Sequence, residues 1–453
     1  MRRVLKHLWV CCLVAFVLPI PVVAGGLKAG AAKVEITPPT GLEMYGYGNR
    51  KGGATSVLDP LMARALVLEV GEQRMALVNM DLGEPLAPAW IERLRDHARK
   101  TCGIAHVLVT ATHTHSGPDI RDEYPPKEGP DWETGVLEKV EKAISDAHQN
   151  AVEAKLGTGY GNVLIGHNRL RLEPDGSITW FERNNTMVPT APVDPTVSVL
   201  RVDNVDGKPL AILVNYACHP VVFGSDHLRY SADYPGVMIK TIEREFDGQA
   251  VTMFLQGGDG DINPYFAVHP LEQDAVKMRD WTGERLGREA ARVAKRIETV
   301  AAPEASLDIA EDLLDSSLRW DVAKFREATA KSWGSKAAEA MDRRLREGIR
   351  LPVATVLINK RIALMTMPGE PFVEHQIDWR NRCPARDAFF FGYTNGGFGY
   401  FPTIRAATLG GYGAANTATW VAPDAGARMV DHALIRVYEM LGRLSDTPED
   451  LTK

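Results

Sequence analysis

HVLVTATHTHSGPD, residues 106–119, begins as a short apolar run rich in valine and ends in two histidines. Alternate side chains of a strand point to the same face, so His113 and His115 would lie side by side at its end. Similar apolar runs alternate with amphipathic stretches along the chain, which is typical of α/β and α+β proteins. The sequence therefore predicts a mixed β-sheet core with flanking helices.

The expected elements follow from period-two and period-three-to-four apolar patterns. Strands are predicted at residues 64–70, 74–80, 106–112, 197–202, 210–216, 251–256 and 354–358, the last paired with 361–366 through a tight hairpin at Asn359-Lys360. Helices are predicted at residues 87–100, 133–150, 234–246, 271–300, 322–347 and 423–441. Residues 317–350 are so rich in Lys, Arg and Glu that we expect a solvated helical insertion. We treat residues 25–453 as one domain.

Composition restricts the kind of ligand. The 453 residues are 45% hydrophobic and 24% charged, with a net charge of -6 and no block of five like charges. Nucleic-acid binding would need a clustered basic face, so we expect none. A small-molecule or lipid substrate fits better, and the sequence does not reveal the oligomeric state.

The N-terminus, MRRVLKHLWVCCLVAFVLPIPVVAGG, has the three parts of a Sec-type signal peptide. We expect cleavage after Ala24 and a secreted or periplasmic protein. The alternative is an uncleaved membrane anchor, but Pro19 and Pro21 interrupt a run that is already shorter than the roughly 20 residues of a spanning helix. No other stretch approaches spanning length, so no stable membrane span is expected after signal removal.

Three cysteines remain after residue 24, namely Cys102, Cys218 and Cys383, and no CxxC pair occurs. At most one disulfide can form, and a cysteine-built metal site is not indicated. Any bound metal would be held by His, carboxylate or Tyr.

Three apolar strands each end in a side chain that can bind a metal. His113 and His115 follow the first, His219 follows LAILVNYAC, and Glu370 follows LMTMPG. Imidazole and carboxylate groups are natural zinc ligands, and a histidine can also act as an acid or base. Each residue alone could equally be structural, but the repetition favours a shared cation.

The glycine-rich loop FLQGGDGDINP, residues 254–264, carries Asp259 and Asp261. These aspartates could bind a second structural cation, Ca²⁺ or Mg²⁺, or cap the amides of their own loop. No GxSxG elbow or nucleotide-binding glycine motif is present, so a metal-activated water is a better nucleophile than a serine.

Several stretches together resemble the N-terminal catalytic domain of the neutral, non-lysosomal ceramidase family. In chain order they are AGAAKVEITPPTGLEMYGYG, MARALVLEV with NMDLG, ATHTHSGP, HNR, NYACHP, DINP, PGEPF and NGGFGYFPT. ATHTHSGP is highly specific, and the others are weaker but collinear. The resemblance spans nearly the whole chain after residue 24.

The resemblance implies roles for eight residues. Zinc would be held by His113, His219, Glu370 and Tyr400. The other four would serve the substrate: His115 beside the scissile carbonyl, Arg169 on polar groups or the product carboxylate, Tyr412 on the developing oxyanion, and Asn263 at the position of a serine that ceramidases need. The implied reaction is hydrolysis of an amide by a zinc-activated water.

Two features loosen the link to ceramide. Asn263 cannot act as a hydroxyl nucleophile, and the sequence reaches residue 453, short of the immunoglobulin-like C-terminal domain of the family, so we expect a short member. The leading hypothesis is a zinc-dependent hydrolase of a ceramide-like or smaller N-acyl amide. The alternatives are an ester, lactone or carbohydrate-derivative hydrolase on the same site, or a metal-binding protein without catalysis. A (β/α)8-barrel amidohydrolase is disfavoured because regular strand–helix alternation is absent.

Overall fold

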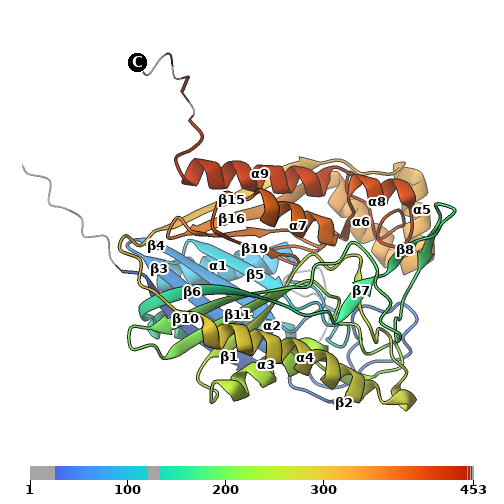
Figure 1. Ribbon diagram of the computed structural model, residues 1–453. Helices are drawn as coiled ribbons and strands as arrows, with labels where there is room; N and C mark the ends of the chain where they lie inside the picture. The colour runs from blue at the N-terminus through green and yellow to red at the C-terminus, as the bar shows by residue number, and fades with distance from the viewer. Residues whose placement is uncertain (1–25, 121–131, 446, 449, 451–453) are drawn as a thin grey trace, which may run out of the picture.

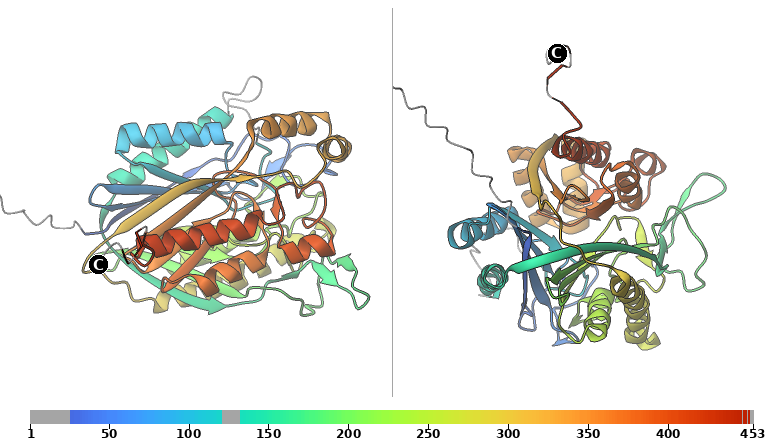
Figure 2. Two further views of the ribbon diagram at one scale, coloured as in Figure 1. Left: turned by 90° about the horizontal axis from the view of Figure 1, so that it is seen from above. Right: turned by 60° about the vertical axis from the view of Figure 1, so that its left-hand side comes forward.

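The computed structural model describes residues 26–120, 132–445, 447–448 and 450. The predicted signal peptide lies outside the described residues. Two β-sheets pack face to face and are enclosed by helices (Figures 1 and 2), which confirms the predicted mixed sheet with flanking helices.

The larger sheet has eight strands in the order β13 (Val251–Gln256), β11 (Pro209–Tyr216), β10 (Thr196–Asn204), β6 (Val152–Asn162), β1 (Lys28–Glu35), β3 (Met62–Val70), β4 (Gln73–Met80) and β5 (His106–Ala111). The smaller sheet has the order β15 (Leu307–Ser316), β16 (Ile349–Ile358), β17 (Ile362–Thr366) and β19 (Asp387–Phe391). The pairs β4–β5, β11–β13 and β17–β19 are parallel and the other pairs in these sheets are antiparallel.

Four short ladders complete the strands: β2 (Ser56–Val57) with β12 (Arg229–Tyr230), β7 (Gly166–Asn168) with β14 (Ile262–Pro264), β8 (Leu170–Leu172) with β9 (Ile178–Trp180), and β18 (Glu370–Pro371) with β20 (Tyr400–Phe401). The helices are α1 (Pro88–Cys102), α2 (Trp132–Gln149), α3 (Asp233–Glu245), α4 (Ala275–Arg296), α5 (Val322–Trp333), α6 (Ser335–Glu347), α7 (Val373–Arg382), α8 (Ile404–Leu409) and α9 (Ala425–Met440), with a 3-10 turn η1 (Leu271–Gln273).

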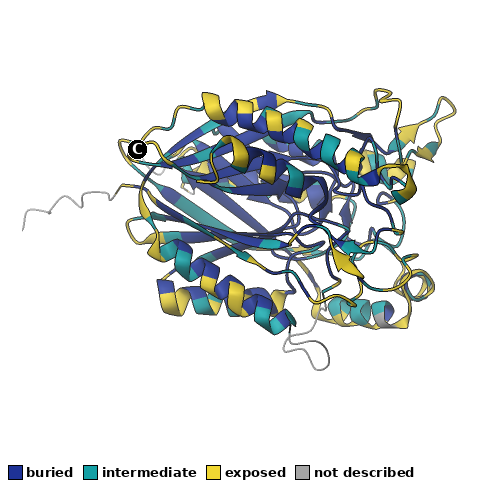
Figure 3. Cartoon of the chain, turned by 90° about the horizontal axis from the view of Figure 1, so that it is seen from below, coloured by how far each residue is buried: buried dark blue, intermediate teal, exposed yellow. Residues whose placement is uncertain are grey.

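Period-two alternation assigns each strand face to a layer. On β5, Leu108 packs in the core between the two sheets, whereas Val107 and Val109 pack against α1 and α2 on the outer face. On β16, Val356 faces the larger sheet and Leu357 faces the helices beyond. The strands are accordingly buried on both sides, while the helices keep exposed outer faces (Figure 3).

All eight predicted strands are present, and the predicted hairpin is confirmed by left-handed φ angles of +53° at both Asn359 and Lys360. Two helix predictions were wrong in extent. Residues 322–347 form two helices because the chain turns at Gly334 with φ +89°. Helix α4 ends at Arg296, and Val300 instead pairs with Leu156.

A buried ion pair ties the larger sheet to α7. Asp194, just before β10, is 3% exposed and accepts hydrogen bonds from Gln376 at 2.6 Å and from both terminal nitrogens of Arg380 at 2.5 and 3.0 Å. Burial alone would raise the pKa of Asp194, but hydrogen bonding and the charge of Arg380 hold that pKa below its ordinary value. The ionised form is therefore stabilised in the folded state.

We expect Asp194→Asn to lower the free energy of unfolding by about 2–3 kcal/mol near neutral pH. Because the folded-state pKa is depressed, this stabilisation is present above the unfolded pKa of about 3.9 and is lost as pH falls through the folded value. Urea unfolding should thus show a smaller difference between variant and parent below about pH 4. Asp378→Asn, which removes an exposed pair on the same helix, is the control and should change little. Equal effects of the two variants would contradict the assignment.

Candidate metal centre and active site

The candidate site lies at the carboxyl ends of strands from both sheets. His113 and His115 follow β5, His219 follows β11, and Glu370 follows β17. The two sheets meet here because the Ala111 amide donates to the Tyr393 carbonyl, just after β19, at 3.1 Å. Side chains from three separated segments therefore reach one point.

Glu370 and Tyr400 are direct register partners in the short parallel ladder β18–β20. The Glu370 amide donates to the Gly399 carbonyl at 2.9 Å, and both side chains are buried. Gly369 can carry no side chain, since a Cβ there would lie 2.4 Å from the Gly399 oxygen. Backbone pairing thus sets the carboxylate beside the phenol.

Nitrogen and oxygen atoms converge at the centre. Glu370 Oε2 lies 3.1 Å from His219 Nε2 and 3.6 Å from His113 Nε2. His113 Nε2 lies 3.2 Å from His115 Nε2. Within the part of the chain that the structure describes, His113, His115 and His219 form the one group of His, Cys, Asp or Glu side chains that could hold a metal ion.

Hydrogen bonds at Nδ1 distinguish the three histidines. His113 Nδ1 donates to the Gly83 carbonyl at 2.6 Å, and His219 Nδ1 donates to the Asp259 carbonyl at 2.7 Å. Both rings therefore turn Nε2 towards Glu370, an arrangement common in metal sites. His115 Nδ1 is buried without a hydrogen-bond partner. Burial lowers the pKa of His113 to about 3 and the pKa of His219 well below its ordinary range, so both rings are neutral as metal binding requires.

Arg169 joins the centre to the other predicted residues. Its guanidinium donates to Tyr400 Oη at 3.0 Å, to Asn263 Oδ1 at 2.9 Å and to the Gly260 carbonyl at 2.8 Å. The Tyr412 ring lies 5.7 Å from the Arg169 Cζ atom and is 39% exposed at the rim. Asn263 also donates to the Glu182 carbonyl at 2.9 Å, so its contact with the centre runs through Arg169.

All eight predicted site residues surround one centre, and sequence reasoning missed two tyrosines beside it. Tyr393 stacks on the His113 ring at 4.0 Å and donates to Asp259 Oδ1 at 2.7 Å. The Tyr45 ring meets the rings of His113 and His115 edge-on at 5.7 and 5.4 Å. Tyr45 lies in the motif AGAAKVEITPPTGLEMYGYG, and Tyr393 lies just after β19. Nothing in the sequence indicates which rings the two tyrosines contact.

Asp259 and Asp261 are occupied by protein contacts. The Asp259 carbonyl accepts a hydrogen bond from His219 Nδ1, and Asp259 Oδ1 accepts one from the Tyr393 hydroxyl. Asp261 accepts hydrogen bonds from the Val373 amide at 2.9 Å and from Asn168 Nδ2 at 2.6 Å. Asp259 Oδ2 is nevertheless buried without a hydrogen-bond partner, and a Ca²⁺ or Mg²⁺ site here stays a prediction.

A cleft of about 820 Å³ opens above the centre and is lined by His115, Glu370, Tyr400 and Tyr412. Residues 322–347 form one of its walls through Thr329, Trp333, Ala337, Met341 and Arg344. The expectation of a purely solvated insertion was therefore wrong, because one face of the α5–α6 hairpin borders the site.

The sequence model of the neutral/alkaline non-lysosomal ceramidase family (N-terminal) matches residues 27–276, more than half of the chain. The chain belongs to this ceramidase family. Similar proteins include the neutral ceramidase of Mycobacterium tuberculosis, 25% identical over 268 residues that cover 53% of this chain and 40% of the relative. The neutral ceramidase of Pseudomonas aeruginosa is 25% identical over 274 residues, covering 57% and 40%. This ceramidase-family chain thus spans about two fifths of the length of the curated relatives it matches.

Solved structures extend the likeness in fold. The crystal structure of neutral ceramidase from Pseudomonas aeruginosa superposes with a TM-score of 0.73 at 18% identity, covering 93% of this chain and 75% of the other. A structure described as ceramidase complexed with C2 gives a TM-score of 0.72 at 17% identity, covering 93% and 76%. The likeness in fold therefore extends well beyond residues 27–276, which the family model matches.

Gly46→Ala should displace the His115 ring, because a Cβ at Gly46 would lie 2.2 Å from His115 Nδ1. Gly41→Ala is a matched control: the two glycines have φ of +101° and +98°, but nothing lies within 4 Å of a Cβ at Gly41. Both variants should cost about 1 kcal/mol of backbone strain. A crystal structure or histidine NMR spectrum should show a moved His115 ring only in Gly46→Ala, and an unmoved ring would refute the packing described.

Proposed function

We propose that this chain is a secreted or periplasmic zinc-dependent hydrolase that cleaves an N-acyl amide bond. The observation that carries the proposal is the convergence of His113, His219 and Glu370, with Tyr400 paired beside Glu370. Membership of the ceramidase family supports an amide as the bond attacked. Export through residues 1–24 is part of the proposal and rests on their sequence alone.

The donor set suits zinc. Two neutral imidazoles, one carboxylate and one phenol offer the nitrogen and oxygen ligands that Zn²⁺ accepts, without any cysteine. His115 is the rival for the fourth position because it belongs to the compact histidine group. We assign it a substrate role instead, since its Nδ1 lacks the carbonyl partner that orients His113 and His219.

Zinc, when bound, would supply Lewis-acid activation of the amide carbonyl and of a water molecule. His115 Nε2, beside the centre and in the cleft, would accept a proton from the attacking water and return it to the leaving amine. The Tyr412 hydroxyl at the rim donates to the oxygen that gains charge, an interaction that contributes about 3 kcal/mol in comparable sites. Arg169 holds Tyr400 and attracts the product carboxylate.

The proposed reaction needs no hydroxyl nucleophile at the position of Asn263, because water attacks the amide. Its amide accepts from Arg169 and donates to the Glu182 carbonyl, so it fixes the guanidinium rather than attacking substrate. Asparagine at the position where ceramidases carry a serine is therefore compatible with amide hydrolysis.

None of the helices among the described residues is long and apolar enough to cross a membrane.

The proposal is tested by metal analysis of the purified protein together with a panel of N-acyl amides and matched esters. We expect about one tightly bound zinc per chain and faster turnover of amides, both abolished by a chelator and restored by zinc. Bound zinc with no turnover of any substrate would indicate a metal-binding protein without catalysis. Turnover of esters alone would reassign the bond.

The two neighbouring histidines should respond differently to substitution. His113→Ala should lose both zinc and activity, because it removes a ligand. His115→Ala should keep zinc and lose about a hundredfold or more in kcat, because it removes a proton-transfer group. His148→Ala, outside the site and paired with Glu69, is the control. Loss of zinc from His115→Ala would reverse the assignment of the two residues.

A further inference from the structure

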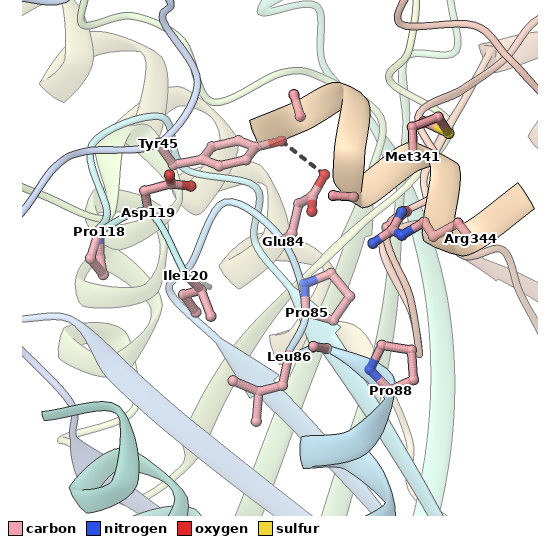
Figure 4. A pocket seen from close by; sticks show the side chains of 14 residues that line it. Tyr45, Glu84, Pro85, Leu86, Pro88, Pro118, Asp119, Ile120, Met341 and Arg344 are labelled. Atoms are coloured by element: carbon pink, nitrogen blue, oxygen red, sulfur yellow. Dashed lines mark hydrogen bonds between the residues drawn. The ribbon is translucent and has the colours of Figure 1, made fainter. Parts of the chain in front are cut away.

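A side pocket of about 240 Å³ opens beside the cleft (Figure 4). Glu84, Asp119 and Arg344 supply its charged groups, and Pro85, Leu86, Pro88, Pro118, Ile120 and Met341 form most of its apolar wall. Its volume lies below the range of pockets that hold a whole drug-sized ligand, so it suits one part of a larger molecule.

The side pocket adjoins the cleft. Tyr45, Glu84, Asp119, Met341, Arg344 and Gly397 line both spaces. Tyr45 forms the partition: its ring contacts the His113 and His115 rings, and its hydroxyl donates to Glu84 Oε1 at 3.2 Å. Gly83, the residue before Glu84, accepts the hydrogen bond from His113 Nδ1. A substrate held at the centre can therefore extend one group into the pocket.

Charge is distributed unequally around the centre. Arg169 lies on the side of Tyr400 and Tyr412, where its guanidinium bonds Tyr400. Glu84 and Asp119 lie past Tyr45, in the side pocket that Arg344 also lines. Hydrolysis of an amide produces a carboxylate and an ammonium ion at neutral pH. The carboxylate suits the Arg169 side, and the ammonium suits the side with the two acidic residues.

The carboxylates of Glu84 and Asp119 are the charged hydrogen-bond acceptors of the side pocket. Arg344 already donates to the Gly397 carbonyl at 2.6 Å, and the Tyr45 hydroxyl is engaged by Glu84. Burial raises the pKa of Glu84 to about 7, so its ionised form is incompletely compensated and would gain from a bound donor or cation. Hydroxyl and amino groups are donors of this kind.

The cleft itself is poor in aliphatic side chains. Met44 and Met341 are its only aliphatic side chains larger than alanine among the described lining residues, and the rest are mainly glycine, aromatic and charged residues. A long alkyl chain gains its binding energy from contact with apolar surface, about 25 cal/mol per Å² buried. The lining therefore favours a polar substrate over a long-chain lipid.

We infer that the side pocket binds the amine half of the substrate and that this half is a small amine carrying hydroxyl groups, the chemistry of an amino sugar or amino polyol. The inference rests on the proposed amide hydrolysis and specifies its substrate class. Glu84 and Asp119 would be specificity-determining residues that accept hydrogen bonds from those hydroxyls.

The test compares amides that share an acetyl group and differ in the amine: N-acetylglucosamine, N-acetylethanolamine and N-acetyldodecylamine. We expect kcat/KM to be at least about tenfold higher for the two hydroxylated compounds than for the dodecyl compound. Preference for N-acetyldodecylamine would overturn the inference while leaving amide hydrolysis intact. Turnover of none of these compounds or of the wider amide panel would overturn the proposed function instead.

Glu84→Gln and Asp119→Asn locate the subsite. Each should raise KM about tenfold for the hydroxylated amides and weaken inhibition by glucosamine, with little change in kcat or in zinc content. Glu92→Gln, on the exposed side of α1 and outside both spaces, is the control. If Glu84→Gln fails to fold, the exposed Asp119 still provides the test. Unchanged KM and glucosamine inhibition in the folded variants would place the amine half elsewhere.

Discussion

Two hydrogen bonds from imidazole to backbone carbonyl, His113 to Gly83 and His219 to Asp259, hold the centre of this molecule together. They fix the direction of Nε2 in rings that come from opposite parts of the larger sheet. Tyr393 links them, since its ring stacks on His113 and its hydroxyl bonds Asp259. Because Tyr393 follows β19 of the smaller sheet, the centre depends on the packing of one sheet on the other.

The sequence was sufficient for elements whose signal is local. Strands with apolar alternation and the Asn359-Lys360 hairpin could be predicted because neighbouring residues determine them. Strand β6 could not, since Gly157, Gly159 and Gly161 interrupt its pattern. Those glycines leave room for α4: a Cβ at Gly161 would lie 2.6 Å from Val293 of that helix. The need for glycine comes from a helix more than a hundred residues away, so no local pattern indicates it.

The site shows the same division. Residues that end apolar strands, such as His113, His219 and Glu370, were predicted because strand ends meet at one edge. Tyr45 and Tyr393 were missed, since their contacts depend on how loops fold back over that edge. The family resemblance suggested Tyr400, and the β18–β20 register gives the physical reason: it sits opposite Glu370. The charged sequence of the α5–α6 hairpin also gave no sign that one of its faces lines the cleft.

Charged side chains are distributed unequally around the centre. Arg169 bonds Tyr400 at the centre, whereas Glu84 and Asp119 line the adjoining side pocket with Arg344. We infer that the carboxylate product is attracted to Arg169 and the amine product to the two acidic residues.

Diffraction from a zinc-soaked crystal, measured on both sides of the zinc absorption edge, tests the central claim most directly. We expect one anomalous peak within about 2.3 Å of His113 Nε2, His219 Nε2, a Glu370 oxygen and the Tyr400 hydroxyl, with His115 outside bonding distance. A peak bound by all three histidines and distant from Tyr400, or no peak at this centre, would contradict it.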